Sequence, residues 1–312
     1  MHAVTIVDGA LRWQEHPDPE PGVGEVLVRV RAAGLNSADR LQVKGFYPAP
    51  PGSPADIPGL ELAGEVAALG PGAERFAVGD RVMALVGGGG QAELCVVHER
   101  HLLAVPDGID WPAAGGFPEA FTTAHDAVFT QAGLAVGDRL CVHGAAGGVG
   151  IAGVQLGVAA GAEVVATVRN EALRAEVEAF GPQVVAPEDF GAHGPFDVVL
   201  ELIGGPNIGE DIRSLAVGGR ITVIGTGAGV TTELNLLDLM LKRGRVHGST
   251  LRARSLEEKA TAARAVERHV LPLLASGRVR VPVDATFPMA EAPAAYEHFA
   301  AGGKLGKIVL VA

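Results

Sequence analysis

The glycine-rich segment Gly144–Gly150, GAAGGVG, has residue types and a spacing suited to binding phosphate. Its pattern, Ala145-x-Gly147-x-x-Gly150, keeps the last two glycines of the dinucleotide fingerprint G-x-G-x-x-G. A strand-like run precedes the segment and a helical run follows it, so backbone N–H groups and the positive helix end can face a pyrophosphate. Glycine-rich turns also occur for packing alone, but this context favours a dinucleotide site. We expect its contacts from Ala146, Gly147, Gly148 and Val149.

The residues at the end of the next strand, about twenty positions past the glycines, distinguish NAD-binding from NADP-binding sites. An NAD-binding enzyme places Asp or Glu there, whereas this sequence offers Arg169 and Asn170. Because a guanidinium binds phosphate through two hydrogen bonds, the pair favours the 2′-phosphate of NADPH, with Arg174 as a second cation. In the alternative interpretation, Arg169 is a solvated charge and Glu171 binds the ribose.

Two different patterns of secondary-structure signals along the chain indicate the elements that hold these residues. Residues 1–118 form short strand-like runs between Gly and Pro turns, typical of a mainly β domain. Residues 119–255 alternate strands with helices, the pattern of a Rossmann domain with a doubly wound parallel sheet. Residues 256–312 begin with a long helix over Leu256–Ala275 and then return to strand signals, so we expect them to rejoin the first domain. The predicted fold class is α/β.

Ligands of a parallel sheet bind beyond the carboxyl ends of its strands. Thr123, and Gly225 with Thr226, are expected at such ends, where they would line the nicotinamide pocket. The strands of this sheet are predicted over Arg139–His143, Glu163–Val168, Asp197–Leu200, Arg220–Ile224 and Arg245–Gly248.

Four further basic residues lie outside these motifs. Arg252, in STLRARS, either reaches the pyrophosphate or is a surface cation. Lys304 and Lys307 are expected to be solvated. His143 is expected to be a hydrogen-bonded strand residue, because the histidines are scattered without metal-ligand spacing.

The composition excludes several classes of function. A net charge of −11 repels a phosphate backbone and no basic run offsets it, so nucleic acid is not an expected partner. No segment reaches about eighteen uninterrupted apolar residues and no secretory signal is recognisable, so we expect no membrane contact and a cytoplasmic protein. The two cysteines, Cys95 and Cys141, cannot build a disulfide framework or a four-cysteine zinc site.

A family resemblance covers nearly the whole chain. The chain resembles the quinone oxidoreductase (zeta-crystallin-like) branch of the medium-chain dehydrogenase/reductase superfamily, and YPAPPG, GGGGQAE and STLRARS look most like the p53-inducible quinone oxidoreductase type. The resemblance implies a GroES-like catalytic domain, a partly open β-barrel, split around the Rossmann domain. Its segments are, in order, GEVLVRVRAAGLNSADRLQVKGFYPAPPG, PGLELAGEV, GDRVMAL, FPEAFTTAHDAV, HGAAGGVG and GKLGKIVLVA.

The resemblance also implies a site without zinc or another metal. Zinc-dependent relatives place a Cys and a His where this sequence has Asn36 and Leu60, and neither residue supplies a thiolate or an imidazole. The resemblance places Asn36, Asp39 and Tyr47 at the active site, with Asn36 as a cofactor or substrate partner and Tyr47 as a donor to the reduced oxygen. The alternatives are an Asn turn, a helix N-terminal charge at Asp39 and loop packing at Tyr47.

These observations together predict NADPH-dependent reduction of quinones or related conjugated carbonyls by hydride transfer. Conjugation spreads the charge that a zinc-free site cannot strongly stabilise. One alternative is an enoyl or 2-alkenal reductase, and another is a non-catalytic NADPH-binding regulatory protein. We also expect a homodimer through the strand Arg245–Thr250, because a second copy would cover its unpaired edge.

Overall fold

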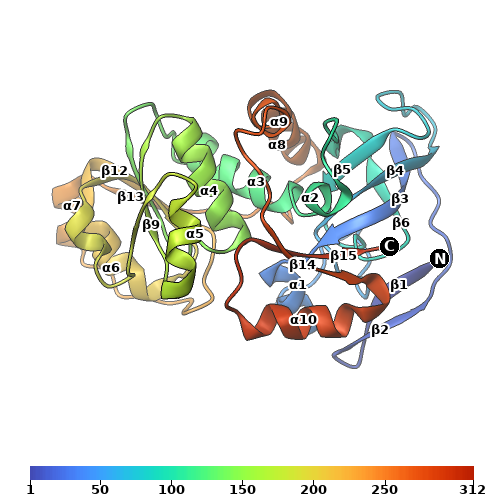
Figure 1. Ribbon diagram of the computed structural model, residues 1–312, viewed down its shortest axis with the longest axis horizontal. Coiled ribbons are helices and arrows are strands. Elements are labelled where there is room, and N and C mark those ends of the chain that lie inside the picture. Colours follow the sequence, from blue (N-terminus) through green and yellow to red (C-terminus); the bar gives the residue numbers. More distant parts are fainter. The chain divides into compact units, whose positions relative to one another are not determined.

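The computed structural model describes all residues from Met1 to Ala312 and divides them into two compact units. The predicted division placed the changes of domain after residues 118 and 255. In the structure the chain leaves unit 1 after Thr122 and returns to it at Leu251. The blue part of the chain in Figure 1 and most of the red part therefore belong to unit 1. Unit 1 comprises Met1–Thr122, Leu251–Gly302 and Gly306–Ala312, and unit 2 comprises Thr123–Thr250 and Gly303–Leu305.

Unit 1 is built on mainly antiparallel strands. Its large sheet has the order β14-β15-β3-β4-β5-β7, with β6 paired to β3, and a separate hairpin joins β1 to β2. Val26, Val28 and Val30 alternate into the core of β3, as expected for a strand with one buried face. The strands are β1 (His2–Val7), β2 (Ala10–Glu15), β3 (Glu25–Gly34), β4 (Glu61–Leu69), β5 (Arg81–Leu85), β6 (Leu94–His98), β7 (Leu102–Ala104), β14 (Val283–Pro288) and β15 (Lys307–Val311).

The helices of unit 1 come from both of its main segments. The predicted helix over Leu256–Ala275 is two helices, because the chain turns at Val270 and Pro272, which lacks a backbone N–H, is accommodated in the first turn of the second one. The helices are α1 (Ser37–Val43), α2 (Trp111–Gly115), α3 (Pro118–His125), whose last residues enter unit 2, α8 (Leu256–His269), α9 (Leu271–Ala275) and α10 (Ala292–Ala301).

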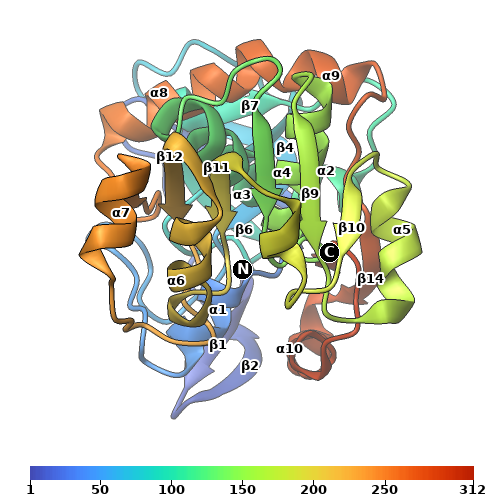
Figure 2. The same cartoon turned by 90° about the vertical axis from the view of Figure 1, so that its left-hand side faces the viewer.

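Unit 2 is a six-stranded parallel sheet with the order β10-β9-β8-β11-β12-β13. Numbered along the chain, this is 3-2-1-4-5-6, the order of a dinucleotide-binding Rossmann sheet. Figure 2 shows its strands, with α5 beside β10 and α6 and α7 beside β12. The elements are β8 (Arg139–Val142), α4 (Gly148–Ala159), β9 (Glu163–Thr167), α5 (Arg174–Glu178), β10 (Gln183–Val185), β11 (Phe196–Glu201), α6 (Gly205–Arg213), β12 (Leu215–Val223), α7 (Leu236–Lys242) and β13 (Arg245–Gly248).

Helix α4 packs unusually close to the sheet. A Cβ on Gly153 would lie 2.7 Å from Cδ2 of Leu200, and one on Gly157 would lie 2.7 Å from Cδ2 of Leu140. Glycine at both positions therefore brings the helix backbone against β8 and β11. This close contact fixes the helix whose N-terminus follows the glycine-rich turn.

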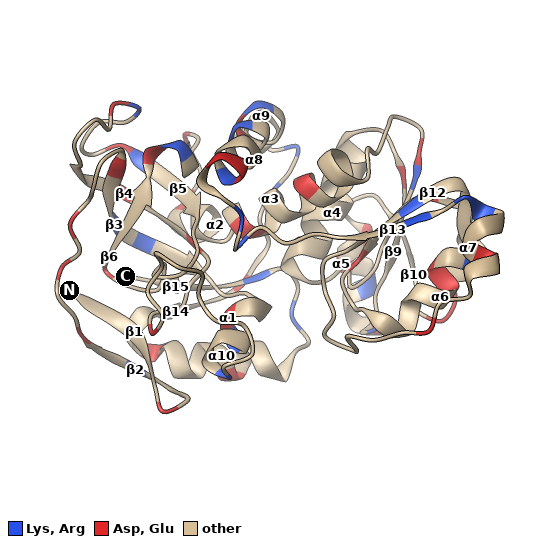
Figure 3. Ribbon diagram, turned by 180° about the vertical axis from the view of Figure 1, so that it is seen from behind, with Lys and Arg blue, Asp and Glu red and all other residues tan.

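Charged residues are spread over both units. Acidic and basic positions are interspersed along the ribbon in Figure 3, in keeping with the absence of a basic run in the sequence. None of the helices has the length and apolar character needed to cross a membrane.

Candidate functional site

The glycine-rich turn lies at the carboxyl end of β8. Gly144 takes a left-handed φ of +62°, so the sharp turn falls on this glycine and not on Ala145, whose side chain is fully buried. Gly147 is exposed and caps the N-terminus of α4. A Cβ on Gly150 would lie 2.4 Å from the carbonyl oxygen of Gly144, so this position accepts only glycine. The turn can therefore present backbone N–H groups and a helix N-terminus to a pyrophosphate.

Two arginines follow the end of β9. Arg169 is exposed, and Nε of Arg174 donates to the carbonyl oxygen of Val168 at 3.1 Å, which holds this second guanidinium close to the strand end. Asn170 accepts the backbone N–H of Ala172 through Oδ1 at 3.2 Å and so caps a short 3-10 turn. The strand end thus carries two cations, which suits a phosphate better than a ribose hydroxyl.

The loop after β11 packs against the glycine-rich turn, and the loop after β12 packs against the loop after β11. A Cβ on Gly144 would meet Cδ1 of Ile203 at 3.0 Å, and a Cβ on Gly225 would meet the carbonyl oxygen of Leu202 at 2.2 Å. Gly225 therefore serves close backbone packing, whereas Thr226 is exposed and presents its side chain.

In unit 1, Asn36 belongs to a polar cluster at the start of α1. Its Nδ2 donates to Oε1 of Glu61 at 2.9 Å, and its Oδ1 accepts from Nζ of Lys307 at 2.7 Å. Lys307 also pairs with Oε1 of Glu61 at 2.6 Å and donates to the carbonyl oxygen of Leu35 at 2.8 Å. The prediction that Lys307 is solvated is wrong: it is 3% exposed, and its charge balances the fully buried carboxylate of Glu61.

Asp39 closes the first turn of α1. Its Oδ2 accepts the backbone N–H of Asn36 at 2.8 Å, and its Oδ1 accepts that of Gly59 at 3.1 Å. Burial raises the pKa of Asp39 to about 7, although both hydrogen bonds and the charge of Lys307 act to lower it. The structure thus gives Asp39 the contacts of a helix N-terminal cap, through which it orients Asn36.

Tyr47 and Arg252 contact each other. Nη1 of Arg252 donates to the carbonyl oxygen of Tyr47 at 2.8 Å, and the guanidinium carbon lies 5.0 Å from the centre of the tyrosine ring. Nε donates to the carbonyl oxygen of Gly87 at 2.8 Å, and Nη2 donates to Gln42. Arg252 is 3% exposed, so its interpretation as a surface cation is wrong. A contact with a pyrophosphate would require it to give up these bonds.

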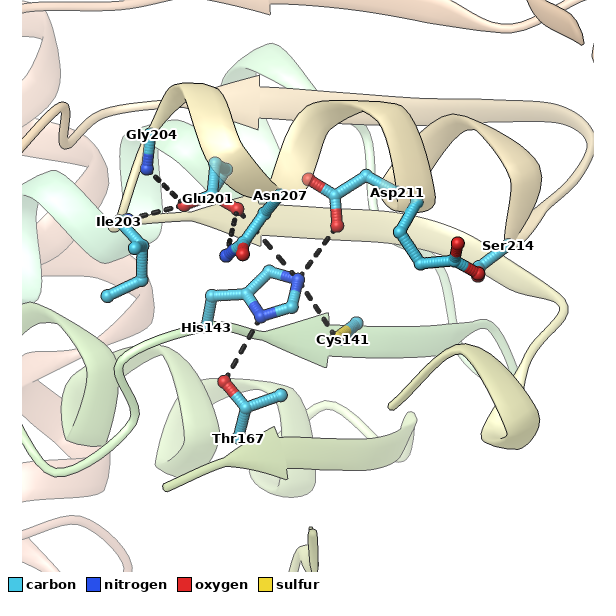
Figure 4. A network of polar contacts seen from close by, with 10 residues as sticks. Cys141, His143, Thr167, Glu201, Ile203, Gly204, Asn207, Asp211 and Ser214 are labelled. Atoms are coloured by element: carbon cyan, nitrogen blue, oxygen red, sulfur yellow. Dashed lines mark hydrogen bonds and ion pairs between the residues drawn. The ribbon is translucent and has the colours of Figure 1, made fainter. Parts of the chain in front are cut away.

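A buried network surrounds His143, as Figure 4 shows. Its Nδ1 lies 3.1 Å from Oγ1 of Thr167, and its Nε2 lies 2.8 Å from Oδ1 of Asp211. His143 therefore has the hydrogen bonds expected of it. Sequence reasoning missed the two carboxylates of the network, Glu201 and Asp211. A signal for Glu201 was present, because an acidic residue ends the apolar strand run VVLE.

Two family descriptions match separate parts of the chain. Residues 22–130 match the alcohol dehydrogenase GroES-like domain, and residues 182–310 match zinc-binding dehydrogenase. The quinone oxidoreductase of Pseudomonas aeruginosa is 31% identical over 314 residues, which cover 96% of this chain and 95% of that protein. The chain belongs to this quinone oxidoreductase-like group of the medium-chain dehydrogenase/reductase superfamily. It is an oxidoreductase of an NAD(P)-binding family.

Other relatives widen the range of proteins similar to this medium-chain reductase. An erythronolide synthase of Saccharopolyspora erythraea is 36% identical over 97% of the chain, but the chain spans only 8% of that synthase. A solved alcohol dehydrogenase superfamily protein of Novosphingobium aromaticivorans superposes with a TM-score of 0.88 at 27% identity, over 100% of this chain and 99% of that one. A mycobacterial protein solved in complex with NADPH has a TM-score of 0.87 at 26% identity, over 100% of both chains.

The matched family is described as zinc-binding, yet the two residues of this medium-chain reductase that stand at the expected positions of a zinc-ligating Cys and His, Asn36 and Leu60, do not fit zinc. Leu60 is 2% exposed and has no ligand atom, and both polar atoms of the Asn36 amide are engaged by Lys307 and Glu61. The cation beside Glu61 is thus an ammonium of the chain itself.

The structure distributes the predicted site residues over both units. Asn36, Asp39, Tyr47 and Arg252 lie in unit 1, where contacts connect Asn36 with Asp39 and Tyr47 with Arg252. Thr123 is 7% exposed on α3 and lies in unit 2. The other residues predicted to bind the cofactor, all in unit 2, are Ala146, Gly147, Gly148, Val149, Arg169, Asn170, Arg174, Gly225 and Thr226.

Proposed function

We propose that the protein reduces quinones or related conjugated carbonyls with NADPH and without zinc. The observation that carries this proposal is the cluster of Asn36, Glu61 and Lys307, in which the chain's own ammonium stands beside the carboxylate. A site without a strong Lewis acid favours substrates whose own conjugation spreads the negative charge formed on reduction.

Unit 2 is proposed to bind NADPH at the carboxyl edge of its sheet. The glycine-rich turn would hold the pyrophosphate, Arg169 with Asn170 and Arg174 would hold the 2′-phosphate, and Thr123, Gly225 and Thr226 would face the nicotinamide. When bound, NADPH supplies the hydride. The close packing at Gly150 and Gly225 supports the proposal, because it shapes backbone at the edge where ligands of parallel sheets bind.

Three residues of unit 1 are proposed to act near the substrate. Burial raises the pKa of Tyr47, so its phenol stays protonated at neutral pH and can donate a hydrogen bond to the reduced oxygen. Asn36 keeps a second lone pair on Oδ1 with which to accept a hydroxyl group. Asp39 is proposed to position Asn36 rather than to transfer a proton, because both of its oxygens accept backbone N–H groups.

The cofactor preference is tested by titrating NADPH and NADH against intrinsic fluorescence. The wild-type protein should bind NADPH more tightly, and Arg169→Ala should narrow the difference by about tenfold, since a hydrogen bond to a charged group contributes about 1.5 to 3 kcal/mol. Arg12→Ala, an exposed arginine on β2 of unit 1, is the matched control and should leave both affinities unchanged. Equal affinities of the wild-type protein for the two cofactors would refute the preference.

The substrate class is tested with a panel of ortho-quinones, para-quinones, enals, enoyl thioesters and simple alcohols. We expect NADPH oxidation with at least one quinone and negligible oxidation of the alcohols, at a rate that a strong chelator leaves unchanged. Activity confined to enoyl thioesters would favour the alternative enoyl reductase, to which the similarity with an erythronolide synthase gives weight. Oxidation of the alcohols, together with no measurable activity on any conjugated substrate, would refute the proposal.

We also propose a homodimer formed through β13. This strand pairs only with β12 and so leaves one edge of the unit 2 sheet open. The nearby helix α7 exposes Leu236, Leu237, Met240 and Leu241, each at 60% or more of its surface. A second copy of the chain, paired across a two-fold axis, would cover both the edge and this apolar helix face.

A further inference from the structure

His143 joins the carboxyl ends of three parallel strands in unit 2. It directly follows β8, its Nδ1 contacts Thr167 at the end of β9, and its Nε2 lies 3.9 Å from Oε2 of Glu201 at the end of β11. Asp211 on α6 contacts the same Nε2 at 2.8 Å. Figure 4 shows the ring between these partners. One imidazole thus connects the carboxyl ends of β8, β9 and β11.

The charges around the ring favour an imidazolium. The side chains of His143, Glu201 and Asp211 are all fully buried, so two carboxyl groups face one ring away from the solvent. Burial lowers the pKa of His143, but the hydrogen bond and the negative charge of Asp211 raise it, and the pKa lies well above its ordinary value. A protonated ring donates through Nε2 to Asp211 and through Nδ1 to Thr167, so both contacts are satisfied. Burial also raises the pKa of Cys141, which stays a neutral thiol.

His143 and its partners adjoin the residues proposed to bind the cofactor. Gly144, the first residue of the glycine-rich turn, follows His143 in the sequence, and Arg169 lies two residues beyond Thr167. Oε1 of Glu201 accepts the backbone N–H groups of Ile203 and of Gly204, the latter at 2.7 Å. The same loop packs its Ile203 side chain against Gly144.

We infer that His143, protonated and paired with Asp211, is a positioning residue for the cofactor. The pair holds the glycine-rich turn, the strand end that carries Arg169 and the loop after β11 in one arrangement, so that the phosphates of the cofactor meet preformed partners. This inference rests on the proposed NADPH site of unit 2. It assigns no contact with the cofactor to His143 itself.

The same three side chains have the donor types of a metal site, since ligand atoms of His143, Glu201 and Asp211 lie within 4.8 Å of one another. Two observations favour a proton over a metal ion. The 2.8 Å separation of Nε2 from Oδ1 of Asp211 is that of a hydrogen bond. Both oxygens of Glu201 already accept N–H groups, with Oε2 receiving Nδ2 of Asn207 at 3.0 Å.

The inference is tested with Asp211→Asn, which removes the counter-charge and preserves the shape of the side chain. In this variant His143 loses its proton at alkaline pH and with it one of its two donated bonds. The Kd for NADPH should therefore rise about tenfold between pH 6.5 and pH 9, whereas the wild-type Kd should change less than twofold between pH 7 and pH 9. At saturating NADPH the turnover rate should stay within about twofold. Ring nitrogen shifts in NMR should report an imidazolium at pH 8 in the wild-type protein only.

A stability control separates positioning from general loosening of the unit. Leu215→Ala cuts a fully buried side chain at the amino end of β12 and should lower thermal stability without changing the Kd or its pH dependence. An unchanged Kd in Asp211→Asn, a neutral His143 ring in the wild-type protein, or a Kd that a chelator raises would each overturn the inference. A wild-type protein that binds neither NADPH nor NADH would instead refute the proposed function, while the NMR measurement would still decide the pairing.

Discussion

Lys307→Met removes the ammonium beside Glu61 and keeps an unbranched side chain of similar length. The carboxylate of Glu61 is fully buried, and Lys307 pairs with it at 2.6 Å while also donating to Leu35 and Asn36. Removing one partner of a buried ion pair costs about 3 to 5 kcal/mol. Glu61 keeps two donors, Nδ2 of Asn36 and the backbone N–H of Glu119, each at 2.9 Å. We therefore expect Lys307→Met to lower the free energy of unfolding by roughly 3 kcal/mol, the lower end of that range.

The double variant Glu61→Gln/Lys307→Met should recover much of this loss, because it buries no unpaired charge. Urea unfolding followed by tryptophan fluorescence measures the effect in the right place, since Trp13 and Trp111 are the two tryptophans of the chain and both lie in unit 1. Lys44→Met, at an exposed lysine just after α1, should change the free energy of unfolding by less than about 0.5 kcal/mol. A loss below about 1 kcal/mol for Lys307→Met, or a double variant no more stable than the single one, would refute this account of the cluster.

Three further predictions concern other parts of the molecule. Because the pKa of Asp39 is raised from 3.8 to about 7, the folded state keeps a proton that the unfolded state loses, so the free energy of unfolding should fall as the pH rises from about 4 to 7, by at most roughly 4 kcal/mol. In Asp39→Asn the free energy of unfolding should not show this decrease. If urea unfolding gives the same decrease between about pH 4 and pH 7 for the variant and the wild-type protein, the prediction is wrong. Gly150→Ala should weaken NADPH binding by more than about tenfold, because its Cβ meets a backbone oxygen at 2.4 Å, whereas Gly209→Ala on α6 should bind normally; fluorescence titration compares them. Met240→Glu should give a monomer in light scattering at micromolar concentration where the wild-type protein is a dimer, and two proteins of equal mass would count against β13 and α7 as the interface.

Strands with strong local patterns could be predicted from the sequence, and weaker elements could not. The bounds of β13 agree with the predicted strand Arg245–Gly248, because it is a short run between clear turns. The three-residue strand β10 was missed, since Gln183–Val185 is too short to show an alternation. The break between α8 and α9 was also missed, although Pro272 gave a signal for it. Secondary-structure elements can thus be predicted from the sequence where their pattern spans several residues or where a proline marks the end of a helix.

The site could be predicted only where its geometry is local. The turn after β8 follows from its glycines, yet the sequence does not say that Gly144 rather than Ala145 carries the left-handed φ. The bond from Lys307 to the carbonyl oxygen of Leu35 joins residues 272 positions apart, and no local pattern indicates it. An isolated lysine near a glycine-rich stretch is typical of a solvated position, so burial by distant strands reversed the expectation.

The pairing of β15 with β3 imposes an order on biosynthesis. Residues 123–250, nearly all of unit 2, leave the ribosome as one continuous piece and can fold there before residues 251–312 have been synthesised. The sheet of unit 1 must wait, because β3 receives β15 only after the whole of unit 2 and α8 to α10 have been synthesised. Until then Glu61 lacks the ammonium of Lys307, and Ala32–Gly34 at the end of β3 lack their partner strand β15. The nascent chain therefore passes through a stage in which the sheet of unit 2 is complete and the sheet of unit 1 is not. Unpaired strand residues are exposed at this stage, so we expect chaperones to bind the chain mainly then.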